Sequence, residues 1–129
     1  MNLVDTVKFD AHGSIPVAVT DFQTRRLLVL CFLDREALNK TLQTGLVHVY
    51  RRSQGHVMLK GESSGHVQRV REVRVNCGMD SLEVRVEQHV AACHEGYLSC
   101  YYRVWDEEAG EWRIVDERLF DPQKVYKAR

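Results

Sequence analysis

The chain has 129 residues, of which 44% are hydrophobic and 28% are charged, and its 18 basic and 18 acidic side chains give a formal net charge of zero. This length and balance predict one globular domain covering residues 1–129. The neutral charge provides no attraction for nucleic acid or for a membrane surface, so we expect neither as a partner.

The sequence also lacks the marks of export. No apolar run approaches the roughly 18 residues of a membrane-spanning helix. The first residues, "MNLVDTVKFDAHG", have no basic segment followed by an apolar one, as a secretory signal would. We therefore expect a cytoplasmic protein, in a reducing compartment where clustered cysteines more often bind metal or react than form disulfides.

The first half of the chain predicts a hairpin followed by a helix. "IPVAVTD" and "RRLLVLCFL" are short β-rich runs separated by the polar stretch "DFQT". In "DREALNKTLQTG", Asp34 suits a helix N-cap, Leu38 and Leu42 are four residues apart on one face, and Gly45 suits the position that ends a helix. This stretch is the clearest helix in the sequence.

Short strands follow the helix. "LVHVYRR" and "HVMLKG" predict strands joined across "SQG", and the alternating "VRVNC" and "SLEVRVEQ" predict two more around the turn "GMD". The Gly- and Ser-rich "GESSGHVQ" predicts a loop. "SCYYRVW" and "EWRIVDE" predict a last hairpin across "DEEAG", and "LFDPQKVYKAR" is a tail that we expect to cover the sheet. The fold class predicted is α+β, mostly β, with short twisted strands and one clear helix.

The four cysteines divide into one and three. Cys31 lies inside the apolar "LLVLCFL" and is interpreted as a core thiol. Cys77 falls in a turn, and Cys93 and Cys100 bracket a loop. Loops can aim three thiolates at one zinc ion and leave a fourth position for water, and His94 beside them could move protons. Spacing alone leaves a metal site, unrelated thiols and a redox pair all open.

Two blocks of the sequence resemble the phosphoribosyl-AMP cyclohydrolase family. "ACHEGYLSCYYR" resembles the family signature A-C-H-T-G-x-x-S-C-F-Y-R, and "KGESSG" resembles its K-G-E-[ST]-S-G block. The stretch "DREALNKTLQTGLVHVYRRSQGHVMLKGESSGHVQRVREVRVNC" is similar to the family pattern as well, in order and with few gaps. The resemblance runs from about residue 15 to about residue 103, most of the chain.

The resemblance implies an activity and an assembly. Members of the family open the adenine ring of phosphoribosyl-AMP between N1 and C6 by hydrolysis, a step of histidine biosynthesis. They are intertwined homodimers in which each zinc ion is shared, here by Cys77 of one subunit and by Cys93 and Cys100 of the other. His94 matches the family's histidine that works with a zinc-activated water, since zinc lowers the pKa of bound water towards ~7. Attack at C6 also requires a proton donor to expel N1.

The resemblance further implies anchors for a phosphorylated purine nucleotide. "KGESSG" offers a cation, hydroxyls and backbone N–H groups, which suit a phosphate cradle, although a solvated turn is the alternative. Arg52 and Ser53 match the second and third positions of the family's S-R-S-R, where a surface arginine beside a strand end is the alternative. The predicted substrate-binding residues are Arg52, Ser53, Lys60, Gly61, Glu62, Ser63, Ser64 and Gly65.

The sequence departs from the family at its second metal. The family's D-C-D-x-D, whose aspartates bind magnesium, is "NCGMD" here, so Asp80 alone keeps a carboxylate. Magnesium prefers oxygen ligands and is usually held by carboxylates, so Asp80 is a weak remnant of that site and magnesium use is doubtful.

Other departures leave two explanations open. Tyr50, Arg51, Gln54 and Met58 replace Trp, Ser, Arg and Trp of the family, and Tyr97 and Leu98 replace two arginines. The chain is either a cyclohydrolase, with an altered magnesium requirement or acting on a related purine nucleotide, or a paralogue that keeps the zinc and the dimer as a non-catalytic binding protein. The intact thiols, His94 and the "KGESSG" block favour an enzyme. Arg51 is a candidate for supplying positive charge that the family takes from magnesium.

Overall fold

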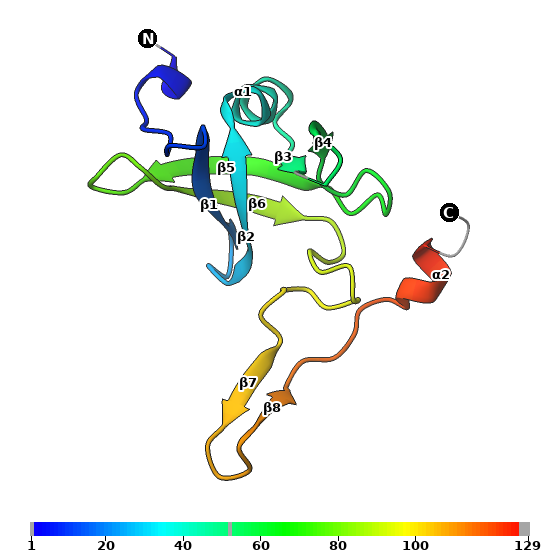
Figure 1. The fold of residues 1–129 in the computed structure, drawn as a ribbon. Coiled ribbons are helices and arrows are strands. Elements are labelled where there is room, and N and C mark those ends of the chain that lie inside the picture. Colours follow the sequence, from blue (N-terminus) through cyan, green and yellow to red (C-terminus); the bar gives the residue numbers. More distant parts are fainter. Residues whose placement is uncertain (1, 52, 127–129) are drawn as a thin grey trace.

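The structure, a computed structural model, describes residues 2–51 and 53–126. Its elements in chain order are η1 (Leu3–Asp5), β1 (Ser14–Asp21), β2 (Leu27–Asp34), α1 (Arg35–Thr44), β3 (His48–Arg51), β4 (His56–Leu59), β5 (Gln68–Val75), β6 (Leu82–Gln88), β7 (Arg103–Asp106), β8 (Glu111–Ile114) and α2 (Pro122–Tyr126). The predicted α+β, mostly β class is confirmed, with α1 as the one long helix (Figure 1).

Four strands form the main sheet in the order β2-β1-β6-β5. The predicted hairpins β1–β2 and β5–β6 are antiparallel, with Val17 opposite Cys31 and Val73 opposite Val84. A parallel pairing of β1 with β6, in which Val17 lies opposite Leu82, joins the two hairpins. The two smaller hairpins, β3–β4 and β7–β8, are also those that the sequence predicts.

One face of the main sheet packs against α1 and β3 and forms the core. The ends of α1 follow the predicted signals, because the Asp34 side chain accepts a hydrogen bond from the Ala37 N–H at 2.8 Å and Gly45 takes a left-handed φ of 75°. The buried aliphatic side chains include Ile15, Val17, Val19, Leu28, Leu33, Leu38, Val47, Val49, Leu82, Val84 and Val86. Full burial of each contributes about 2 kcal/mol to folding.

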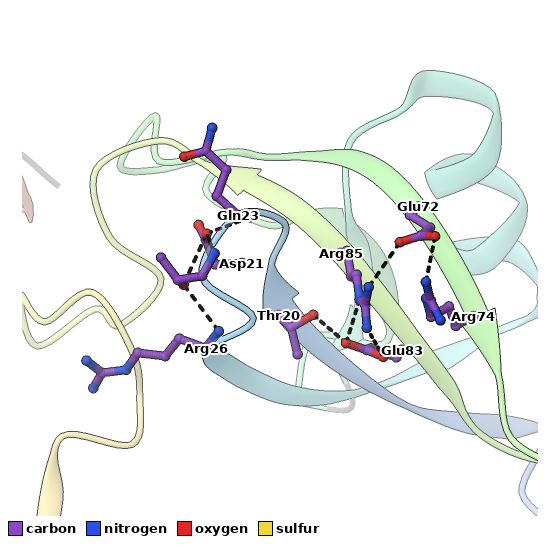
Figure 2. A network of polar contacts seen from close by, with 9 residues as sticks. Thr20, Asp21, Gln23, Arg26, Glu72, Arg74, Glu83 and Arg85 are labelled. Atoms are coloured by element: carbon purple, nitrogen blue, oxygen red, sulfur yellow. Dashed lines mark hydrogen bonds and ion pairs between the residues drawn. The ribbon is translucent and has the colours of Figure 1, made fainter.

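The other face of the sheet carries an ion-pair network (Figure 2). Arg85 Nε lies 3.0 Å from Glu83 Oε2, and its Nη1 lies 3.3 Å from Glu72 Oε2. Thr20 donates a hydrogen bond to Glu83 at 2.8 Å, and Arg74 donates one to Glu72 at 3.1 Å. These hydrogen bonds, from Arg85 to Glu83 and from Arg74 to Glu72, lower the pKa of both carboxyl groups.

Glu83→Gln is expected to reduce the loss of stability in acid. The pKa of Glu83 is lowered from its ordinary 4.5 in the folded state, so its contribution is complete above that value and disappears as the pH falls through the folded pKa. The Tm measured from about pH 7 down to about pH 3 should therefore fall less steeply in the variant. Glu108→Gln, in the exposed turn between β7 and β8, is the control and should keep the wild-type slope.

The hairpin β7–β8 projects from the body of the chain as an arm (Figure 1). Trp105 and Trp112 face each other across it, with ring centroids 5.3 Å apart. The arm exposes large apolar side chains, and Trp112 is 64% exposed. Within the residues that the structure describes, no helix is long and apolar enough to cross a membrane.

The tail does not lie over the sheet, so that expectation is wrong for its described part, residues 119–126 (Figure 1). The Leu119 N–H donates to the Gly96 oxygen at 2.7 Å, and the Phe120 ring packs edge-on against His66 at 4.7 Å. A Cβ at Gly96 would lie 2.5 Å from the Phe120 oxygen, so the absent side chain admits the tail at this loop. The tail thereby ends beside the loops after β4 and β6.

Candidate active site

A cavity of about 400 Å³ lies between the loop after β4 and the loop after β6. This volume is within the usual range for small-molecule sites. The predicted residues that line it are Lys60, Gly61, Glu62, Ser63, Ser64 and His94. Its other walls are Arg51, Gln54, Met58, Leu59, His66, Ala91, Ala92 and Tyr126. The "KGESS" stretch and His94, predicted from separate blocks of sequence, therefore share one cavity.

The cavity wall at Lys60 is fixed by backbone contacts. The Lys60 N–H donates to the Val47 oxygen at 2.9 Å, and its ammonium lies 3.4 Å from the Ala92 oxygen. Gly61 has a φ of 84°, and a Cβ there would lie 2.4 Å from the His66 oxygen. The loop can close on itself only because this residue is glycine, which places Lys60 between the two loops.

Gly65 is held within its own loop. It is not among the described residues that line the cavity, and its N–H donates to the Gly61 oxygen at 2.7 Å. The Gly65 amide thus closes the turn of the loop, and a role of Gly65 in binding substrate stays a prediction.

The two residues matched to the family's S-R-S-R have different outcomes. Arg52 lies outside the described residues. Ser53 does not line the main cavity but a neighbouring open hollow of about 690 Å³, together with Cys31 and Tyr50. Lys60 and Arg51 line both spaces, so cationic side chains lie where they meet.

Cys93 and Cys100 lie together, as predicted. Burial, and after it the neighbouring Cys93, raises the pKa of Cys100 to about 11. The loop between them is held in place because the Cys93 N–H donates to the Tyr97 oxygen at 3.1 Å and the Cys100 N–H to the Leu28 oxygen at 2.8 Å. Two adjacent sulfur atoms form a donor pair suited to a soft cation.

Cys31 lies at the edge of the core, packed against it and half-buried, as its apolar surroundings predict. Its thiol donates to the Val17 oxygen at 3.7 Å. Burial raises its pKa to about 11, an effect that Lys60 opposes and Cys100 increases. Cys31 is therefore electrostatically coupled to the site, which the sequence did not indicate.

Cys77 lies apart from the other two predicted ligands. It is exposed in the turn between β5 and β6, whereas Cys93 follows the far end of β6, and Figure 1 shows these loops at opposite ends of the sheet. A strand of this length spans roughly 20 Å, whereas thiolates on one zinc ion each lie about 2.3 Å from it. Accordingly, the described part of the chain contains no cluster of three His, Cys, Asp or Glu residues able to hold a metal ion.

The remnant of the magnesium motif forms a closed turn. Asn76 Nδ2 donates to Asp80 Oδ1 at 2.6 Å, and Asn76 Oδ1 accepts the N–H groups of Asp80 and Ser81, each at 2.9 Å. Met79 takes a left-handed φ of 59° within the turn. The amide oxygen of Asn76 is thus committed to the backbone, which leaves the carboxylate of Asp80 as the main oxygen donor at this position.

His94 lines the cavity, and its side chain is 80% exposed. Its Nε2 lies 3.2 Å from Glu95 Oε1. A histidine with a neighbouring carboxylate at a cavity wall can hold a proton and deliver it to a bound molecule.

The departures from the family pattern fall into two groups. Arg51, Gln54 and Met58 line the cavity, so they can alter what it binds. Tyr97 is buried and stacks on Tyr102 with ring centroids 3.7 Å apart, and Leu98, half-buried, packs against the core. The two arginines that the family has at these last positions are thus replaced by packing side chains.

Comparison with known proteins decides the family. The family model for phosphoribosyl-AMP cyclohydrolase matches residues 29–102. The chain belongs to the phosphoribosyl-AMP cyclohydrolase family.

The relatives cover nearly all of the chain. Phosphoribosyl-AMP cyclohydrolase of Methanosarcina barkeri is 45% identical over 98% of this chain and 98% of its own length. The enzyme of that name from Pelotomaculum thermopropionicum is 46% identical over 98% of this chain and 97% of its own length. The histidine biosynthesis bifunctional protein HisIE of Thermoanaerobacter pseudethanolicus is 40% identical over 98% of this chain, which spans 58% of that longer protein.

Two aromatic residues that line the cavity were not predicted from the sequence. His66 occupies a variable position of the cyclohydrolase pattern, S-G-x-x-Q, and Tyr126 follows the matched residues by more than a strand and a loop. No local signal marks either residue, because His66 reaches the cavity through the folding of the loop after β4 and Tyr126 through the packing of the tail against Gly96 and His66.

Proposed function

We propose that this protein opens the adenine ring of phosphoribosyl-AMP by hydrolysis between N1 and C6, a step of histidine biosynthesis, with zinc in its site. The observation that carries the proposal is the shared cavity, in which His94 faces the "KGESS" loop beside the Cys93–Cys100 pair. The names of the relatives, which align over almost the whole chain, point to the same substrate. The thiols that this site requires fit a reducing compartment, the cytoplasm.

The residues of the cavity divide the chemistry among them. Water adds to C6, the C6–N1 bond breaks, and N1 leaves with a proton. His94 is positioned to take a proton from water and return it to N1, and Glu95 lies beside its imidazole. Lys60 and the hydroxyls of Ser63 and Ser64 hold a substrate phosphate.

The donor set fits a zinc ion shared between two chains. Cys93 and Cys100 provide two adjacent sulfur ligands, and the exposed Cys77 is free of its own chain's site and accessible to a partner. When bound, zinc supplies Lewis acidity that activates water at neutral pH. The reading of Cys77, Cys93 and Cys100 as its ligands follows the family pattern.

A second copy of the chain would also cover exposed apolar surface. β2 exposes Leu30 and Phe32, at 51% and 50%, on the face of the sheet opposite the core. The arm exposes Val104, Trp105, Trp112, Ile114 and Val115. Exposed apolar side chains gathered in this number mark an interface. We therefore propose the intertwined homodimer that the family resemblance implies.

The dimer gives a direct prediction. Sedimentation at micromolar concentration should show a dimer, and Trp112→Ala should shift the equilibrium towards monomer, because the exposed ring of a monomer becomes buried in the interface. Glu108→Ala, in the turn of the same arm, is the control and should leave the dimer intact. A wild-type protein that is monomeric and yet carries its full zinc content would contradict the shared site.

The proposed activity is tested by ring opening of phosphoribosyl-AMP, followed by ultraviolet absorbance. Turnover by the zinc-loaded protein is expected. If zinc is fully bound and no turnover occurs under any metal condition, the second candidate takes its place, a paralogue that binds or acts on a related purine nucleotide. The departures at Arg51, Gln54 and Met58 in the cavity wall are the observation that keeps this candidate in view.

Turnover is expected without added magnesium. Asn76 and Gly78 stand where the family has carboxylates, and Asn76 is hydrogen-bonded to Asp80 within the turn. Activity in buffer treated with a chelator that leaves tightly bound zinc in place should therefore persist. Strict magnesium dependence of the wild-type protein would show that loss of the two aspartates does not remove the need for magnesium.

The double variant Asn76→Asp with Gly78→Asp provides a readout independent of activity. A Cβ at Gly78 would lie 3.1 Å from Asp80 Oδ1, so three carboxylates would crowd together in the turn. Magnesium should relieve their repulsion and raise the Tm of this variant, whereas the Tm of the wild type should not respond.

A further inference from the structure

We propose that Tyr126, in the short C-terminal helix α2, is a substrate-contacting residue whose ring packs against the purine base in the cavity. The identity of the base rests on the proposed function. The family model matches residues 29–102 and does not reach this residue. The cavity would thus be completed by a part of the chain beyond the matched region.

Tyr126 lies at the cavity wall together with both functional loops. It lines the same space as Lys60, Ser64 and His94. It also lines a second surface hollow, which it shares with His94 and Pro122. The Tyr126 side chain is therefore next to the proposed proton carrier on one side and opens onto the substrate cavity on the other.

Contacts of the tail with two loops hold Tyr126 in this position. The Leu119 N–H donates to the Gly96 oxygen at 2.7 Å, and the Phe120 ring meets His66 at 4.7 Å. Asp121 Oδ1 accepts the Gln123 N–H at 2.9 Å and starts α2. The first contact joins the tail to the loop that contains His94, the second joins it to the loop after β4, and the third lies within the tail at the start of the helix that carries Tyr126.

Two aromatic rings, His66 and Tyr126, line the cavity here, and Phe120 packs between them outside its lining. The Phe120 ring lies 6.3 Å from Tyr126 and 4.7 Å from His66, in edge-to-face geometry in both pairs. Lys60 and Arg51, which suit phosphate groups, lie where the cavity meets the neighbouring hollow that holds Cys31 and Tyr50, a space that Tyr126 does not line. A base has a flat π face that packs well on an aromatic ring, so the base belongs on the Tyr126 side and the phosphates on the cationic side.

The test compares Tyr126→Ala with Tyr126→Phe. Loss of a base-stacking ring weakens binding on the order of 10- to 100-fold, so Tyr126→Ala should raise KM for phosphoribosyl-AMP by that factor and change kcat much less. It should raise the Kd for AMP, measured by calorimetry, by a similar factor. Tyr126→Phe should behave as the wild type, because the ring and not the hydroxyl makes the contact.

Val125→Ala, a truncation of the neighbouring residue of α2 that does not line the cavity, is the matched control and should leave KM and Kd unchanged. No residue of α2 is buried, so these variants should fold as the wild type does. An unchanged KM and Kd in Tyr126→Ala would overturn the inference, and so would a Tyr126→Phe variant as weak as Tyr126→Ala. Absence of AMP binding to the wild type would also overturn it.

The two proposals fail differently. If the wild type binds AMP in a way that depends on Tyr126 but does not turn over phosphoribosyl-AMP, the inference stands and the proposed reaction is wrong. If turnover occurs and Tyr126→Ala leaves both constants unchanged, the reaction stands and the role of Tyr126 is wrong.

Discussion

Cys77→Ser is expected to abolish both zinc binding and ring opening while leaving the fold intact. The wild-type protein should contain about one zinc ion per chain by elemental analysis. Cys77 is exposed in a turn, so an exchange of sulfur for oxygen should change the stability of a single chain by less than about 0.5 kcal/mol. Loss of the metal would then report a ligand, and not a structural residue. Cys31→Ser is the matched exchange and should keep the zinc.

Mixing two inactive variants tests whether the site is shared. In a heterodimer of Cys77→Ser and Cys100→Ser, one site has lost both ligands, and the other has an intact Cys77 from one chain and intact Cys93 and Cys100 from its partner. Random mixing should therefore restore about a quarter of the wild-type activity, because half of the dimers are mixed and each has one complete site. No recovery, with mixed dimers demonstrated, would show that the ligands do not come from two chains.

Local chemistry explains what the sequence could predict of the fold. The start and end of α1 depend on Asp34 and Gly45, and each acts within a few residues of itself. The hairpins follow in the same way from alternating apolar residues around short turns. The parallel pairing of β1 with β6 joins strands some 60 positions apart, as with Val17 and Leu82, and no local pattern encodes it.

In the site, too, local motifs could be predicted and positions that depend on distant contacts could not. The sequence indicated Lys60 and His94 through two recognisable blocks, and the structure brings them to one cavity. The position of Tyr126 could not be predicted, because it depends on contacts of the tail with Gly96 and His66. The role of Asn76 in closing the turn could not be predicted either. The sequence shows that a carboxylate is lost, but not that the Asn76 amide oxygen accepts backbone hydrogen bonds in its place.

His94→Asn is expected to lower kcat by about 10²- to 10⁴-fold while zinc stays bound. The side chain is 80% exposed and contacts the neighbouring Glu95, so its loss should not affect the fold. Asparagine keeps a polar group of similar size but cannot carry a proton between water and N1 near neutral pH. The substrate anchors Lys60 and Ser63 are untouched, so KM should change far less than kcat.

Two measurements separate proton transfer from loss of metal or shape in this variant. Elemental analysis should find the wild-type zinc content, since His94 is not among the proposed ligands. Added imidazole should restore part of the rate, because His94 is exposed at the cavity wall and a small base can take its place. His12→Gln, at an exposed position before β1, is the control and should keep the wild-type kcat. A fully active, zinc-loaded His94→Asn protein would mean that another group, with His66 in the same wall as the next candidate, carries the proton to N1.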